Sequence, residues 1–235
     1  MNQEFIEILK KSFKTYLTFG ARSNEKLKVL HPFIAEKILN RLGNDYSANS
    51  LGLLGDHSKE SCVKGRYLDK KVDITIHKQD DDVAGLAVKF VMSNYSQNSN
   101  NYFENMLGET ANIRTARIPY FQIFCIFDKL PYYDNSGNIT KWETISKHNL
   151  DKYIKLSDDN IDMFFHTPNK TLLFLIHMDI DIPENINTKK QFSEYLLSND
   201  FELSVAEVDY EFGRAVIVND FGQFVDKVCH IIQGV

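Results

Sequence analysis

The chain has 235 residues, of which 43% are hydrophobic and 25% are charged, as in an ordinary globular protein and unlike a disordered chain. No apolar run approaches the ~18 residues that cross a bilayer, so we expect no membrane partner. The formal net charge of −5 excludes a histone-like nucleic-acid binder, and three separated cysteines without a CxxC pair favour reduced thiols in a cytoplasm.

Two amphipathic helices are predicted at the start of the chain. Apolar residues recur at helical spacing over residues 3–17. A second helix begins near Asn24, or at Pro32, which a first helical turn tolerates, and it ends at Gly43. Two segments without helical periodicity follow: a predicted loop at 44–55, rich in Asn, Ser and Gly, and a predicted strand around 61–68.

A β-hairpin is the most informative local prediction. Residues 71–76 and 85–91 each alternate between apolar and polar positions, and a short polar loop joins them. This alternation places Asp73 on one face of the first strand and places Ala87 and Lys89 together on one face of the second. We therefore expect Asp73 and Lys89 to face one another. The opposite face is expected to hold the apolar residues Val72, Ile74, Ile76, Leu86, Val88 and Phe90.

A helix and a buried strand are predicted after the hairpin. The polar residues 93–101 are expected to form a loop that caps a helix from about 102 to 114. Residues 119–127 are almost continuously apolar, which suits a strand that is buried on both faces. This order of elements predicts an α/β fold with a central mixed β-sheet that is flanked by helices.

The second half of the chain has fewer clear signals. We predict a turn at 134–138, strands at 171–178, 201–208 and 214–218, and helices at 189–197 and 221–232. No linker or repeat separates the halves, so we expect a single domain over residues 1–235. Its core would span about 24–128, with a C-terminal elaboration over about 129–235.

Asp73 and Lys89 are the residue types that phosphodiester hydrolysis requires. A divalent cation polarises the phosphate and is held by carboxylates, whereas a lysine orients the attacking water and stabilises charge. A cross-strand ion pair, worth roughly 0.2–1 kcal/mol, is the simpler interpretation of the same two residues.

The chain resembles the PD-(D/E)XK nuclease superfamily, which includes many type II restriction endonucleases. Asp73 is followed after the hairpin by Ala87-Val88-Lys89 inside an apolar strand, and then by a helix and a buried strand. This resemblance covers roughly residues 33–127 and implies a restriction-endonuclease-like core. It also implies that Asp73 and position 87 hold the metal, that Lys89 is the catalytic lysine, and that Glu36 is an auxiliary metal-binding acid.

Ala87 departs from the motif of this superfamily, because alanine cannot bind a metal where the motif has an acid. Three accounts compete. In the first account, a glutamate was replaced deliberately to trap a substrate or to avoid toxicity. This account is favoured because the strand otherwise matches the motif. The acid can instead have moved to the following helix, at Glu104 or Glu109. The chain can also be a naturally inactive relative.

The resemblance implies a Mg²⁺-dependent endonuclease that acts on double-stranded DNA by direct hydrolysis, with Mn²⁺ able to replace Mg²⁺. Cutting both strands implies a homodimer or a higher symmetric oligomer. The superfamily suggests a role in bacterial restriction or antiphage defence, with an activating ligand in some cases. The alternative is a non-catalytic DNA-binding or assembly module that retains the nuclease fold.

Three further groups of residues are weaker candidates for nucleic-acid contacts. Each has a simpler structural interpretation, as a charged strand edge, a helix cap or packing residues, respectively. The groups are a basic stripe (Lys59, Lys64, Arg66, Lys70 and Lys71), a polar cluster (Asn94, Gln97, Asn98, Asn100 and Asn101) and two tyrosines (Tyr132 and Tyr133).

Overall fold

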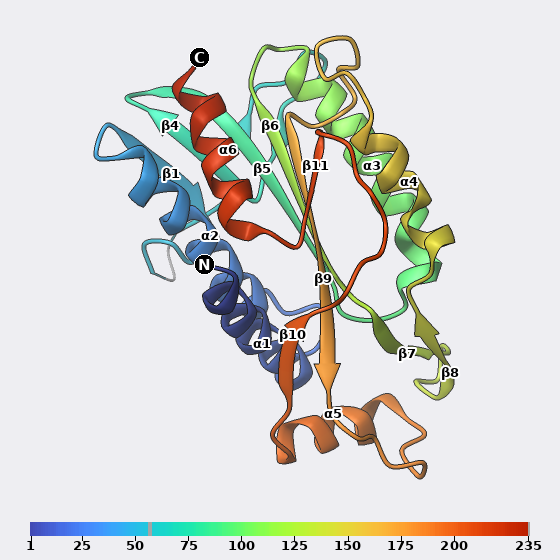
Figure 1. The fold of residues 1–235 in the computed structure, drawn as a ribbon. Helices are drawn as coiled ribbons and strands as arrows, with labels where there is room; N and C mark the ends of the chain where they lie inside the picture. Colours follow the sequence, from blue (N-terminus) through green and yellow to red (C-terminus); the bar gives the residue numbers. More distant parts are fainter. Residues whose placement is uncertain (56–57, 235) are drawn as a thin grey trace.

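The computed structural model describes residues 1–55 and 58–234, and its centre is a seven-stranded mixed β-sheet (Figure 1). The strands follow the order β1-β4-β5-β6-β9-β10, and β11 also pairs with β9. Strands β5, β6, β9 and β11 run parallel, whereas β1, β4 and β10 pair in antiparallel fashion. The bounds are β1 Tyr46–Ser50, β4 Ile74–Lys78, β5 Asp81–Val91, β6 Tyr120–Phe127, β9 Lys170–Asp179, β10 Glu202–Val205 and β11 Val216–Val218.

Helices cover both faces of this sheet, which confirms the predicted α/β class. Helices α1 (Asn2–Phe19), α2 (Glu25–Leu42) and α6 (Phe221–Gln233) pack on one face (Figure 1). Helices α3 (Tyr95–Arg114) and α4 (Lys147–Ser157) pack on the other. Among the described helices, none is long and apolar enough to span a membrane.

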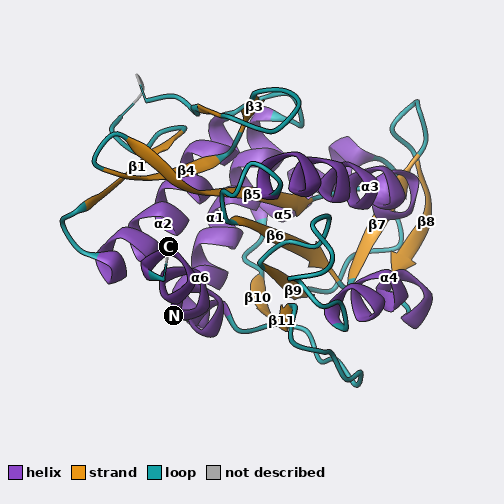
Figure 2. Cartoon of the chain, turned by 90° about the horizontal axis from the view of Figure 1, so that it is seen from above, coloured by secondary structure: helices purple, strands orange, loops and turns teal. Residues whose placement is uncertain are grey.

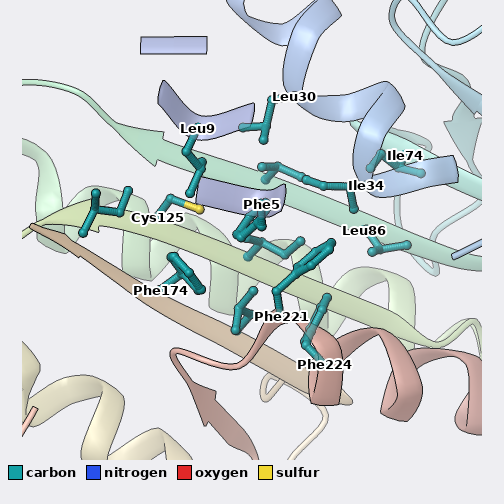
Figure 3. Packing of buried hydrophobic residues seen from close by; sticks show 14 of the residues in the cluster. Phe5, Leu9, Leu30, Ile34, Ile74, Leu86, Cys125, Phe174, Phe221 and Phe224 are labelled. Atoms are coloured by element: carbon teal, nitrogen blue, oxygen red, sulfur yellow. The ribbon is translucent and has the colours of Figure 1, made fainter. Parts of the chain in front are cut away.

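Strand β6 divides the core between the two faces. All eight of its residues are buried, as the apolar run predicts. Alternate side chains point to opposite sides, so that Phe121 joins the core under α1, α2 and α6, while Phe124 joins the core under α3 and α4. Figure 3 shows the first of these cores, in which the rings of Phe5 and Phe221 stack with centroids 4.1 Å apart.

Strand β1 occupies a segment for which the sequence predicts a loop, so that prediction is wrong. Tyr46 to Ser50 pair with β4 in antiparallel register, from Tyr46 opposite Lys78 to Ser50 opposite Ile74. Serine, alanine and asparagine have little preference for strands. The open edge of β4 provides the hydrogen bonds that define β1, and local sequence carries no signal of that edge.

Helix α3 begins at Tyr95, whereas the sequence predicts a loop up to about residue 101. The residue before it, Asn94, has a φ of 48°, in the left-handed region that asparagine tolerates. The predicted strand at 61–68 shrinks to β2 (Cys62–Val63), which pairs with β3 (Lys70–Lys71) outside the main sheet.

The second half contains three elements that the sequence does not predict. Strands β7 (Lys129–Tyr133) and β8 (Ile139–Thr144) form a hairpin whose tip is the predicted turn at 134–138, and α4 follows it. This hairpin lies beyond the ends of α3 and α4 (Figure 2). The remaining predictions are confirmed as β9, β10, β11, α6 and α5 (Lys189–Ser198).

Candidate functional site

The site lies where β4 and β5 separate. Their antiparallel pairing ends with Ile74 opposite Leu86. In the described part of the chain, the rest of β5 pairs with β6 alone. Asp73 immediately precedes β4, and its carboxylate accepts a hydrogen bond from the backbone N–H of Val88 at 2.7 Å. This bond fixes the Asp73 side chain beside the segment that carries Ala87 and Lys89.

Val72 does not follow the predicted alternation. Ile74, Ile76 and Leu86 are buried in the core under α1, α2 and α6, as predicted. Val72 instead packs with Tyr120 and Ile113 on the opposite side, against Ala87. Regular strand pairing starts only at Ile74, so the two-residue alternation does not extend back through Asp73.

The structure brings Asp73, Ala87 and Lys89 to the wall of one cavity of about 190 Å³. Lys89 is exposed, and its ammonium lies over the ring of Tyr102, 4.9 Å from the centroid. The methyl group of Ala87 contributes no acid at the position where the superfamily motif has one.

Glu109 also lines this cavity, whereas Glu104 does not. The Glu109 carboxylate accepts a hydrogen bond from the Tyr120 hydroxyl at 3.1 Å and pairs with the Lys70 ammonium at 2.6 Å. Glu104 is exposed, and its charge acts on Lys152. Of the two acids considered as replacements for the missing one, only Glu109 is positioned beside Asp73.

The surroundings of Asp73 disfavour the ionised form of its carboxyl. Burial raises the pKa of the Asp73 carboxyl above its ordinary value. The hydrogen bond from Val88 and the positive charges of Lys89 and Lys70 act in the opposite direction, while the negative charge of Glu109 raises the pKa further. A carboxylate in such a position has a high affinity for a positive partner.

Three potential metal ligands converge on this region: His31, Glu60 and Asp73. One ligand atom from each lies within 4.8 Å of the other two. His31 comes from α2, Glu60 from the segment before β2, and Asp73 from the start of β4. Glu36, the acid implied by the family resemblance, is exposed on α2 and is not part of this group.

His31 and Glu60 are not among the predicted site residues, because the three ligands come from three separate segments and share no motif spacing. One signal was present. His31 lies among the buried residues of α2, next to Leu30 and one turn before Ile34 and Ala35. A buried polar side chain needs a hydrogen-bond partner or an ion, so a histidine on the apolar face of a helix indicates a polar partner inside the protein.

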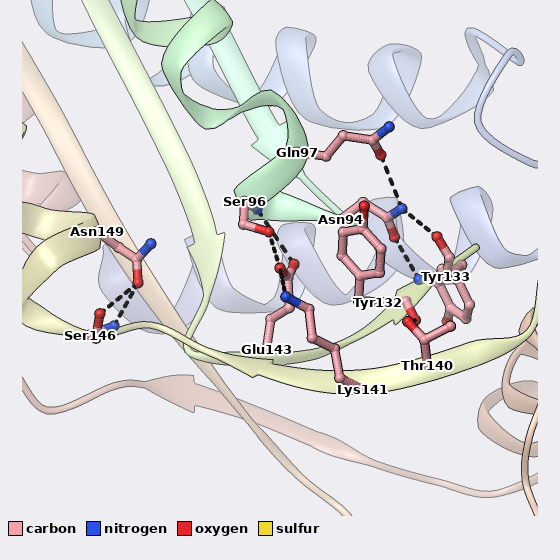
Figure 4. Close-up of polar contacts among 10 residues, drawn as sticks. All are labelled: Asn94, Ser96, Gln97, Tyr132, Tyr133, Thr140, Lys141, Glu143, Ser146 and Asn149. Atoms are coloured by element: carbon pink, nitrogen blue, oxygen red, sulfur yellow. Dashed lines mark hydrogen bonds and ion pairs between the residues drawn. The ribbon is translucent and has the colours of Figure 1, made fainter. Parts of the chain in front are cut away.

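The expected capping loop after β5 is wrong: most of the polar cluster lies in the first turns of α3, and the Asn94 side chain bonds to β7 instead of capping the helix (Figure 4). The Asn94 side chain donates to the carbonyl of Tyr133 at 2.8 Å and accepts from its N–H at 3.0 Å. Tyr133 is itself buried in the core, so it is not a platform for stacking bases. Tyr132 is half-buried and lies under the ammonium of Lys141.

Comparisons with protein-family models, with curated proteins and with solved structures each gave no match. A functional assignment therefore depends on the geometry of the site.

Proposed function

We propose that this chain is a metal-dependent endonuclease of the PD-(D/E)XK type that hydrolyses phosphodiester bonds in double-stranded DNA. The observation that carries the proposal is the bond from Val88 N–H to the Asp73 carboxylate. It joins the first motif acid to the backbone between Ala87 and Lys89, so that all three motif positions share one cavity.

The order of elements supports a restriction-endonuclease-like core. Helix α2 precedes the antiparallel β4–β5 hairpin, α3 follows, and β6 returns parallel to β5. This is the order that the resemblance implies, and both motif strands have a neighbour on each side in the sheet.

The residues around the cavity suit phosphodiester hydrolysis. A bound divalent cation would supply charge neutralisation on the phosphate and a more acidic water nearby. Asp73 would hold that cation through a carboxylate oxygen. The exposed ammonium of Lys89 would donate to a phosphate oxygen and hold the attacking water in line. Lys89 thereby stabilises the negative charge that develops during attack.

Positive charge near the C-terminal end of α3, the helix that also carries Glu109, supports a nucleic-acid substrate despite the acidic net charge. A second cavity, of about 500 Å³, is lined by Arg66, Arg114 and Arg117 near the C-terminal end of α3. The Arg114 guanidinium donates to three backbone carbonyls and is structural. Arg66 and Arg117 are exposed, and exposed guanidinium groups bind phosphates well.

The biological setting rests on the superfamily alone. We place the activity in a bacterial cytoplasm, in restriction or antiphage defence, under the control of an activating ligand. Two sites related by a two-fold axis would cut both strands of a duplex, so we expect a homodimer or a larger symmetric oligomer.

The second candidate function, a non-catalytic DNA-binding or assembly module, is favoured by Ala87. A single substitution separates the two functions. Ala87→Glu adds the missing acid, and Ala87→Gln is a control of the same size without the charge. We expect Ala87→Glu to cut plasmid DNA in Mg²⁺, to stop in EDTA, and to lose about 10²–10⁴-fold in rate when Lys89→Met is added. The Ala87→Gln variant should not cut.

Two other results would change the assignment. If Ala87→Glu is folded and binds duplex DNA, yet cuts no faster than Ala87→Gln, the chain is a binding module. If the unsubstituted chain cuts in Mg²⁺ and Glu109→Gln abolishes the cutting, Glu109 replaces the missing acid.

A further inference from the structure

His31 is a buried histidine without a hydrogen-bond partner. Its side chain is fully buried, and neither Nδ1 nor Nε2 has a hydrogen-bond partner among the described residues. Buried polar atoms are almost always paired in folded proteins, with protein groups, water or an ion. Two unpaired nitrogens on one ring therefore indicate a partner beyond the described residues, and water or an ion can fill that role.

The surroundings of His31 show which partner fits. A ring nitrogen of His31 and carboxylate oxygens of Glu60 and Asp73 lie within 4.8 Å of one another. Ligands that bind a metal at about 2.1 Å lie roughly 3–4 Å apart, so small side-chain rotations bring these atoms to a common ion. Two carboxylates beside a neutral ring also provide the negative charge that a divalent cation requires.

Each of the three ligands is prepared for this role. One Asp73 oxygen is held by Val88 N–H, and one Glu60 oxygen is held by the Lys71 ammonium at 3.1 Å. Each carboxylate thus keeps a second oxygen for an ion. Burial lowers the pKa of His31 to about 4, although the charge of Glu60 acts to raise it and that of Lys89 to lower it, so the ring is neutral at pH 7 and its lone pair is available.

We propose that His31, Glu60 and Asp73 bind a single divalent transition-metal ion, and that the His31 nitrogen makes this site select Mn²⁺ over Mg²⁺. Imidazole is a good ligand for first-row transition metals, whereas Mg²⁺ prefers oxygen ligands and gives up water reluctantly. The catalytic meaning of this site rests on the proposed function. The site gives the chain a metal-binding set that does not depend on an acid at position 87.

Metal binding is measured on the whole chain after removal of metals with EDTA. Isothermal titration with Mn²⁺ and with Mg²⁺ gives the selectivity, and pulsed electron paramagnetic resonance of bound Mn²⁺ detects a directly coordinated nitrogen. We expect Mn²⁺ to bind at least tenfold more tightly than Mg²⁺, with a ¹⁴N coupling in the spectrum. His31→Gln should abolish that coupling and weaken Mn²⁺ binding at least tenfold.

Glu60→Gln and Glu36→Gln form a matched pair that does not disturb the buried ring. Glu60 belongs to the group of ligands, whereas Glu36 is an exposed residue of α2. We expect Glu60→Gln to weaken Mn²⁺ binding at least tenfold and Glu36→Gln to leave it unchanged. This pair keeps the test decisive if His31→Gln fails to fold.

The outcomes separate this inference from the proposed nuclease activity. Nitrogen-coordinated Mn²⁺ that depends on Glu60, in a chain whose Ala87→Glu variant cuts DNA in neither Mg²⁺ nor Mn²⁺, supports the metal site and removes the nuclease function. Equal affinities for Mn²⁺ and Mg²⁺, or equal effects of the two glutamate substitutions, overturn the metal site, whether or not Ala87→Glu cuts DNA.

Discussion

Asp73 illustrates how a single residue of the candidate site opposes the stability of the fold. Its carboxylate is largely removed from water, and in the described structure it has a single hydrogen bond, from Val88 N–H. The neighbouring Glu109 adds negative charge. Functional sites commonly retain such unfavourable groups because binding requires them, and the rest of the fold compensates.

Asp73→Asn should stabilise the metal-free protein at neutral pH. Because the folded state raises the pKa of Asp73, the ionised form destabilises the fold, and that effect is present at pH values above the raised pKa. Asparagine removes the charge and can still accept from Val88 N–H. The gain in the free energy of unfolding should shrink as the pH falls toward 3.8, the ordinary pKa of an Asp carboxyl. Urea unfolding in EDTA at several pH values measures it, and a loss of stability at pH 7 would contradict this account.

His31 should make the metal-free protein sensitive to acid. Burial lowers its pKa from 6.5 to about 4, so the unfolded chain binds a proton in this range that the folded protein excludes. Stability is therefore lost as the pH falls through this window, with a slope of up to about 1.4 kcal/mol per pH unit from this residue.

In EDTA, the free energy of unfolding of His31→Gln should depend less steeply on pH than that of the unsubstituted protein. Substitution of the exposed His148 by Gln is the matched control and should change little. Parallel pH profiles for the unsubstituted protein and His31→Gln would rule out the effect.

At the scale of elements, Asn94 connects the first turn of α3 to the end of β7. It combines a left-handed φ of 48° with two hydrogen bonds to the backbone of Tyr133. Both features favour asparagine at this position, and together they hold the start of the helix that carries Tyr102 and Glu109 to the site cavity.

Asn94→Ala should lower the free energy of unfolding by about 2–4 kcal/mol, because alanine loses both hydrogen bonds and is strained in the left-handed region. Asn94→Gly loses the same bonds without the strain, so its loss should be smaller by roughly 1–2 kcal/mol. Denaturant unfolding measures both variants. Equal losses would show that the backbone conformation contributes nothing.

The elements that the sequence predicts are those with strong local patterns. Strand β6 is an almost continuous apolar run, and the sequences of β4 and β5 alternate with a period of two. Strand β1 is missed because pairing with β4, more than 20 residues further along the chain, defines it. The site ligands His31 and Glu60 are missed because they reach Asp73 from separate segments. The β7–β8 hairpin is local, and only its turn is predicted. Asp73, Ala87 and Lys89 could be predicted because one hairpin carries all three.

At the scale of the whole molecule, α1 and α6 pack together on the same face of the sheet. Phe5 stacks on Phe221 and meets Phe174 of β9 edge to face, with centroids 5.0 Å apart. The Asn2 side chain also donates to the carbonyl of Asn219 and accepts from the N–H of Phe221. The two ends of the described chain thus form one aromatic core.

Phe5→Ala should lower the free energy of unfolding by about 3–5 kcal/mol, because it leaves a cavity between α1, α6 and β9. For a chain of this size, each kcal/mol lowers Tm by roughly 2–4 °C. Phe19→Ala, at the other end of α1, removes a ring that is 62% exposed and should have little effect. Similar Tm values for the two variants would show that the Phe5–Phe221 stack is not a main support of the fold.

The packing of α6 on α2 has a consequence for the order of events during synthesis. The Cys229 thiol donates to the carbonyl of Ile38, and the Arg41 guanidinium pairs with Asp226. The rings of Phe33 and Phe221 also stack. Helix α2 carries His31, and it forms these contacts only after the ribosome has made α6. Cys229 of α6 lies 191 positions after Ile38. A nascent chain therefore contains Asp73 and Lys89 long before α2 has its contacts with α6, so His31 is held in its final position later than the two hairpin residues.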